Sequence, residues 1–145
     1  AIVIGKLSKN LNEDNWMESV LGFTNANDLS ERILQGQDGS FNGNFTRAKG
    51  FDTFCPLGPV IQTEFDKNPE LNIRCYVNNE LKQDGNTRDM IFSIGEILTF
   101  VTSIMTLLPG DVLLTGTPEG VSKVSPGDEI RIEIDTIGTL VNNIK

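Results

Sequence analysis

The stretch Leu71-Asn72-Ile73-Arg74-Cys75-Tyr76-Val77-Asn78-Asn79-Glu80-Leu81-Lys82-Gln83-Asp84 has the pattern of a β-hairpin. Its first half alternates along the chain, which is the period of a strand with one buried face. Asn78-Asn79 stands where a two-residue turn is expected, because asparagine tolerates the left-handed backbone of such turns. The return strand stops before Gly85-Asn86, so the sequence predicts a hairpin over 71–84.

The segment that follows has a helical period. Ser93 and Glu96 have the spacing of a capping box, in which each satisfies a backbone N–H at the helix start. Pro109-Gly110 ends the run. The sequence therefore predicts one main helix over about 94–108, whose apolar stripe is a core face. The stripe consists of Ile94, Ile97, Leu98, Val101, Ile104, Met105 and Leu108.

Further strands are predicted on both sides of this helix. They cover residues 1–6, 20–24, 111–115, 130–134 and 139–142. A chain rich in strands with one good helix is typical of an α+β fold, mostly β, with an antiparallel or mixed sheet. At 145 residues without an internal linker, we expect a single domain over 1–145.

The composition narrows the classes of function. The chain has 20 acidic and 12 basic residues and a net charge of −8. Nucleic-acid binding needs clustered Lys and Arg, and no basic stripe is present, so we expect no nucleic-acid partner. The chain contains no histidine, which excludes a Ser-His-Asp triad and a His-ligated zinc site built from this sequence.

Cysteine usage and hydropathy indicate the compartment. Cys55 and Cys75 lack C-x-x-C spacing and are too few for a disulfide framework, so a reducing, cytoplasmic setting is expected. The most apolar window, 91–108, contains Glu96 and several hydroxyl residues, so we expect no membrane span.

The stretch Thr46-Arg47-Ala48-Lys49-Gly50-Phe51-Asp52-Thr53-Phe54-Cys55-Pro56-Leu57-Gly58-Pro59 has no sustained period. Its prolines and glycines predict a rigid, non-helical path over Cys55–Pro59 that holds Lys49 and Asp52 in fixed directions. A solvated surface loop is the alternative interpretation. Further along, the turn Gly116-Thr117-Pro118 after a buried strand is either a plain tight turn or an anion-binding one.

Five segments, taken in order, resemble the fumarylacetoacetate hydrolase family, specifically its small bacterial-type branch of acylpyruvate hydrolases, decarboxylases and hydroxymuconate-type isomerases. They cover nearly the whole chain. They are Asn27-Asp28-Leu29-Ser30-Glu31-Arg32-Ile33-Leu34-Gln35, the stretch Arg47–Pro59, Asn79–Ser93, Leu114–Val121, and Pro126-Gly127-Asp128 with Gly138-Thr139-Leu140.

The resemblance implies a β-roll fold, usually dimeric, with a Mg²⁺ or Mn²⁺ ion held by three carboxylates. Asp28 matches one of them, although from the residues alone a helix-capping carboxylate is the alternative. The other two match glutamates that would precede Ala1, as would the family's catalytic His and Glu. We therefore expect the chain to lack the N-terminal part of the natural protein.

The resemblance also implies roles for other side chains. Lys49 matches the lysine beside the metal, where its ammonium would complement an enolate and deliver a proton. Thr117 matches a threonine that binds the substrate carboxylate, and Gln35 a residue at the substrate's polar end. Arg32 is assigned to the substrate or to a structural ion pair. Asp52 and Thr53 are expected to orient Lys49 and the metal's water ligands.

Together these matches predict a Mg²⁺-dependent hydrolase that cleaves a C–C bond in a 2,4-dioxo acid. Isomerisation, oxaloacetate-type decarboxylation and tautomerisation are the alternatives within the same site, because they need the enolate and a proton donor but no attacking water. A catalytically inactive fragment or binding domain is the alternative from another class.

Overall fold

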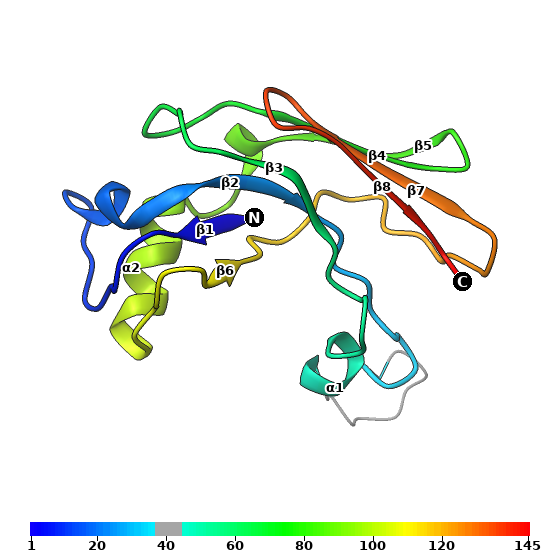
Figure 1. Cartoon of the computed structure of the whole chain (residues 1–145), viewed down its shortest axis with the longest axis horizontal. Helices are drawn as coiled ribbons and strands as arrows, with labels where there is room; N and C mark the ends of the chain where they lie inside the picture. The colour runs from blue at the N-terminus through cyan, green and yellow to red at the C-terminus, as the bar shows by residue number, and fades with distance from the viewer. Residues whose placement is uncertain (37–44) are drawn as a thin grey trace.

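The computed structural model describes residues 1–36 and 45–145 of the chain, and the fold is α+β as the sequence predicts. Figure 1 shows two sheets with one main helix beside the first. The strands are β1 (Ile2–Ile4), β2 (Val20–Ala26), β3 (Leu57–Gln62), β4 (Asn72–Val77), β5 (Glu80–Asn86), β6 (Val112–Leu113), β7 (Glu129–Ile134) and β8 (Gly138–Asn143). The helices are α1 (Phe45–Lys49), α2 (Ile94–Ile104) and two 3-10 turns, η1 (Trp16–Ser19) and η2 (Thr87–Asp89).

Each sheet has four strands. Their orders are β3-β2-β1-β6 and β5-β4-β7-β8, and every pairing in the described part of the chain is antiparallel. The sequence left antiparallel and mixed sheets open, and the structure has the antiparallel arrangement. The two sheets are joined through β2, where the buried Asn25 donates its side-chain amide to the carbonyls of Ile132 (3.1 Å) and Gly138 (2.9 Å).

The predicted hairpin and the predicted helix start are both present, although β5 continues through Gly85-Asn86, where the sequence predicts a break. The turn residues Asn78 and Asn79 have φ of 50° and 67°, as the hairpin requires. The capping box of α2 is complete: the Ser93 hydroxyl accepts from the amide of Glu96, and the Glu96 carboxylate accepts from the amide of Ser93. The bond from the Ser93 backbone amide, and then the Ser93 side chain, hold the pKa of the Glu96 carboxyl below its usual value.

Helix α2 ends at Ile104, four residues before the predicted end. Leu107 instead forms a two-bond bridge with Ser8, and its side chain is buried there. This pairing with a distant segment replaces the last helical turn. The first part of the stripe packs into the core through Ile94 and Leu98, whereas its C-terminal members are exposed: Ile104, Met105 and Leu108.

Two further segments differ from the prediction. The strand expected over 111–115 is only β6, because Asp111 turns the chain by accepting the Leu108 amide on its carboxylate (2.7 Å) and donating its own amide to the Leu108 carbonyl. The stretch 46–59 is not irregular throughout: it contains part of α1 and the start of β3. Helix α1 is not apparent from a periodic pattern, since it has one turn and a single buried residue, Ala48.

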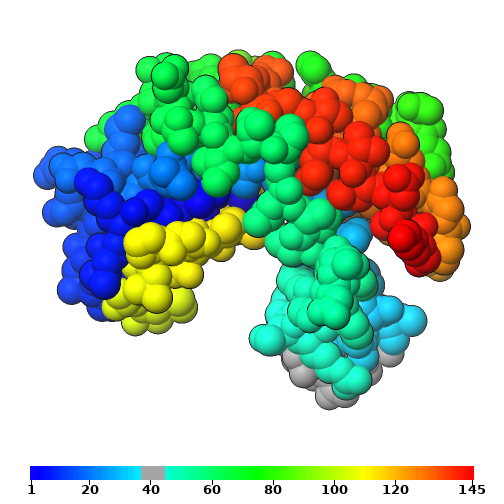
Figure 2. Space-filling view, in the orientation of Figure 1, coloured from blue at the N-terminus to red at the C-terminus, as the bar shows by residue number. Residues whose placement is uncertain are grey.

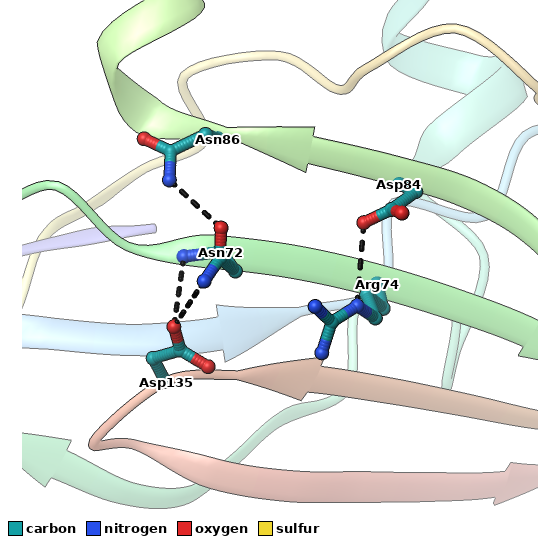
Figure 3. A network of polar contacts seen from close by, with 5 residues as sticks. All are labelled: Asn72, Arg74, Asp84, Asn86 and Asp135. Atoms are coloured by element: carbon teal, nitrogen blue, oxygen red, sulfur yellow. Dashed lines mark hydrogen bonds and ion pairs between the residues drawn. The ribbon is translucent and has the colours of Figure 1, made fainter.

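A row of polar contacts crosses the second sheet (Figure 3). Asn72 on β4 accepts from Asn86 on β5 (2.9 Å), and its amide nitrogen donates to Asp135 (2.6 Å), next to β7. Arg74 pairs with Asp84 across the same two strands (3.3 Å). The backbone pairing sets the register of β4 with β5 and β7, and these exposed side-chain contacts follow it.

Candidate active site

Two segments, 27–36 and 45–56, project from the two sheets as a lobe, drawn cyan to teal in Figure 2. Three backbone hydrogen bonds of 2.9 to 3.1 Å hold them side by side. These bonds run from Asn27 N to Pro56 O, from Leu29 N to Phe54 O and from Glu31 N to Ala48 O. The second segment of the resemblance thereby lies along the first, although 11 residues, 36–46, stand between them in the sequence.

This pairing brings Asp28 and Lys49 together. The Lys49 ammonium donates to the Asp28 carboxylate in an ion pair, and the two side chains stay 34% and 42% exposed. The capping alternative for Asp28 is not what the structure shows, because the helical turn after it is bonded through Glu31, whose carboxylate accepts the amide of Ile33 (2.9 Å). The Asp28 carboxylate instead contacts the Lys49 ammonium group.

Two groups that the sequence did not single out lie near this pair. Burial raises the pKa of the Cys55 thiol, and the charge of Asp28 raises it further, while Lys49 and the Ala1 amino group lower it. Burial lowers the pKa of the Ala1 amino group from 8.0 to about 6. The Cys55 thiol therefore interacts electrostatically with three charged groups: Asp28, Lys49 and the Ala1 amino group. Cys55 stands in the quoted stretch, but its nearness to Ala1 depends on long-range folding.

Four other predicted site residues lie in the same lobe: Arg32, Gln35, Asp52 and Thr53. Arg32 donates to the side-chain oxygen of Gln35 (2.5 Å), within the same lobe as Asp28. Among the residues that the structure describes, Arg32 forms this hydrogen bond and no ion pair. In the part of the chain that the structure describes, neither Asp52 nor Thr53 bonds to Lys49, so their supporting role stays a prediction.

Thr117 is held by β5 rather than by the lobe. Its hydroxyl accepts from the side-chain amide of Gln83 (2.8 Å), which also donates to the carbonyl of Pro118 (2.7 Å). No contact joins Thr117 to Asp28 or Lys49 within residues 1–36 and 45–145. Gln83 was quoted as part of a motif, but its partner was not foreseeable from spacing alone.

The donor set fits a hard divalent cation only in part. The Asp28 carboxylate is an oxygen ligand of the kind that Mg²⁺ and Mn²⁺ prefer, and it lies at the surface of the lobe. Across the described ranges, however, no three His, Cys, Asp or Glu side chains converge on a point. Asp28 is the candidate ligand that the sequence predicts within the described residues, and the source of the other two ligands stays a prediction.

The whole chain, residues 1–145, matches the family model described as "Fumarylacetoacetate (FAA) hydrolase C-terminal". The chain belongs to this family. Its sequence is 40% identical over 154 residues to an oxaloacetate tautomerase, the mitochondrial FAHD2B of Bos taurus, covering 99% of this chain and 48% of that protein.

Solved structures of family members share the fold. A 5-carboxymethyl-2-hydroxymuconate delta-isomerase from Mycobacterium smegmatis superposes with a TM-score of 0.90 at 43% identity, over 99% of this chain and 55% of that one. A maleylpyruvate hydrolase from Sphingobium sp. SYK-6, solved with manganese(II) and pyruvate, gives 0.86 at 36% identity, over 99% and 51%. The curated and solved relatives thus include an isomerase, a tautomerase and a hydrolase.

The chain spans 47 to 64% of the length of the curated relatives it matches. A further finding concerns membranes: among the described residues, none of the helices has both the length and the apolar character to cross one.

Proposed function

We propose that residues 1–145 form the catalytic C-terminal domain of a divalent-metal-dependent enzyme that cleaves a C–C bond in a 2,4-dioxo acid by hydrolysis. The observation that carries this proposal is the Asp28–Lys49 pair, which combines an oxygen ligand for a hard cation with an ammonium group. The family assignment supports it, as does the relative solved with manganese(II) and pyruvate. A homodimer and a small oxo-acid substrate belong to the same proposal.

Asp28 would hold the cation, Mg²⁺ or Mn²⁺, with two glutamates supplied by residues that precede Ala1 in the natural polypeptide. The Ala1 amino group interacts electrostatically with Cys55, and that thiol with Asp28, which is consistent with residues joined to Ala1 reaching the site. When bound, the cation supplies Lewis-acid stabilisation of negative charge that develops on a keto acid oxygen.

Lys49 would hold a proton on its side-chain nitrogen, which lies against Asp28 and remains partly open to solvent. In that position it places positive charge beside an enolate and delivers its proton to the substrate carbon. Gln35, held by Arg32, would contact the polar end of the substrate, and Thr117 would donate to its carboxylate. The positive charges of Lys49 and Arg32 would offset the chain's net charge of −8 only locally, where the anionic acid would bind.

Isomerisation or tautomerisation is the second candidate. It is favoured by the somewhat higher identity to two solved isomerases (43% and 45%) than to two solved hydrolases (36% and 40%). Both reactions need only the enolate and a proton donor, which is the role assigned to Lys49. Hydrolysis in addition needs an activated water.

The proposal is tested with the complete natural polypeptide and Mg²⁺, using acetylpyruvate as the hydrolase substrate and enol-oxaloacetate as the tautomerase substrate. We expect turnover of one of them, and we expect Lys49→Met to reduce kcat by about 100-fold or more, within the range for a positioned proton donor. The matched control is Lys67→Met, which removes another exposed lysine, bonded to the carbonyl of Glu13, and should leave kcat unchanged.

Turnover of acetylpyruvate to acetate and pyruvate supports hydrolysis, and turnover of enol-oxaloacetate alone supports the second candidate. If wild type turns over neither acid and shows no Mg²⁺-dependent thermal shift with oxalate, the domain is a non-catalytic or binding module and the proposal is wrong. Unchanged kcat in Lys49→Met would equally remove Lys49 from the mechanism.

A further inference from the structure

We infer that Gln83 is a positioning residue that fixes the Thr117 hydroxyl as a hydrogen-bond donor to the carboxylate of the bound acid. This inference rests on the proposed function, in which Thr117 contacts that carboxylate. It adds a residue on β5, outside the projecting lobe, to the determinants of substrate binding.

The orientation of the Gln83 amide follows from its two partners. Its nitrogen lies 2.7 Å from the carbonyl oxygen of Pro118 and 2.8 Å from the Thr117 hydroxyl oxygen. A carbonyl only accepts, so the group that faces it must be the amide NH₂. Both amide protons are thereby used: one goes to Pro118 and the other to Thr117.

The direction of the Thr117 hydroxyl proton follows in turn. Because its oxygen already accepts from Gln83, its own proton must point away from Gln83. Within the described residues this hydroxyl donates to no protein group, and Thr117 is exposed. A hydroxyl oriented in this way offers one donor to solvent or to an anionic ligand. A hydrogen bond from such a donor to a carboxylate is charge-assisted.

The turn that carries Thr117 also lies close against β5 at two points that do not involve the Gln83 side chain. A Cβ added at Gly120 would lie 1.9 Å from the carbonyl oxygen of Lys82, and one added at Gly85 would lie 2.7 Å from the Pro118 ring. This close backbone approach persists when the Gln83 side chain is changed. Substitution of Gln83 should therefore redirect the hydroxyl without releasing the turn.

The test uses the complete natural polypeptide with Mg²⁺ and measures the Kd of oxalate and of pyruvate by calorimetry, together with KM and kcat on the substrate turned over. Gln83→Met keeps the length of the side chain and removes both donors. We expect it to raise Kd and KM about tenfold and to change kcat less than threefold, because a contact to a non-reacting carboxylate is made equally in ground and transition states.

Gln83→Glu sharpens the test at nearly constant shape. Its carboxylate would accept the Thr117 proton and so use up the donor meant for the ligand, so we expect a larger rise in Kd than in Gln83→Met. The matched control is Asp84→Asn, the next residue on β5, which removes an exposed ion pair with Arg74 and should leave Kd unchanged.

The decisive comparison combines Gln83→Met with Thr117→Val. If Gln83 acts through the hydroxyl, the double variant binds oxalate no more weakly than Thr117→Val alone. Additive losses, or an unchanged Kd in Gln83→Met, would overturn the inference while leaving the proposed function intact. If wild type itself binds neither oxalate nor pyruvate, the proposed function fails and the inference falls with it.

Discussion

Lys49 and Asp28 matter for the candidate site through their position, and they contribute little to the stability of the fold. Both side chains are more than a third exposed, and an ion pair at such a site contributes at most about 1 kcal/mol to the free energy of unfolding. The fold does not need this pair. Three backbone hydrogen bonds nevertheless hold its two segments together, so the structure maintains an acid and a base in contact at the surface of the lobe.

The Ala1 amino group gives a prediction on pH in a polypeptide that starts at this residue. The group donates to the carbonyl of Thr24 (2.8 Å), and burial lowers its pKa to about 6. Between pH 6 and 8 the unfolded chain binds more protons at this group than the folded chain does. The free energy of unfolding should therefore rise as the pH rises from 6 to 8, by at most about 2–3 kcal/mol.

Urea denaturation at pH 6 and at pH 8 measures this difference. Acetylation of the Ala1 amino group removes the titrating proton and is the control: the acetylated chain should lose this part of the pH dependence. An equal rise in both forms would show that other groups cause it, and a fall in stability toward pH 8 would contradict the burial of this amine.

Helix α2 illustrates how far local signals predict an element. Its start was predictable, because Ser93 and Glu96 complete each other's backbone bonds without help from the rest of the chain. We expect Ser93→Ala to lower the free energy of unfolding by about 1 kcal/mol, measured by urea denaturation. The control is Ser103→Ala, whose exposed hydroxyl bonds to the carbonyl of Phe100 within the last turn, and which should change stability less. An equal loss in both variants would contradict the capping role.

The end of α2 was not predictable from its own residues. The stripe continues to Leu108, but Leu107 is taken into the bridge with Ser8, about 100 residues earlier in the chain. Helix α1 likewise pairs with a distant segment, through the bond from Glu31 N to Ala48 O, whereas β6 is shortened locally by the turn at Asp111. In contrast, the hairpin β4–β5 was predicted because its turn residues and alternation lie within one short segment.

The candidate site shows the same difference between what local sequence predicts and what depends on distant contacts. Sequence reasoning identified Asp28, Lys49 and Thr117 through a family resemblance, and the structure brings the first two into contact. It did not identify the partners that depend on tertiary packing: Cys55 and the Ala1 amino group beside the ion pair, and Gln83 beside Thr117. Residue types in one motif indicate chemistry, but the neighbours that tune them come from segments far away in the sequence.

At the scale of the whole molecule, two antiparallel sheets form the scaffold and the lobe between β2 and β3 carries the ion pair (Figures 1 and 2). Within the described residues, no three His, Cys, Asp or Glu side chains are grouped so that they could hold a metal ion. Since the chain spans about half the length of its relatives, the complete polypeptide is the form in which the cation site must be measured.

That measurement is the binding of Mn²⁺ to the complete polypeptide in the presence of oxalate, followed by electron paramagnetic resonance. We predict that wild type binds the ion and that Asp28→Asn weakens binding at least about tenfold, because a neutral amide replaces a charged ligand. Asp84→Asn, which also loses an exposed ion-paired carboxylate, should bind as wild type does. Undiminished Mn²⁺ binding in Asp28→Asn would contradict the assignment of the Asp28–Lys49 pair as the core of the active site.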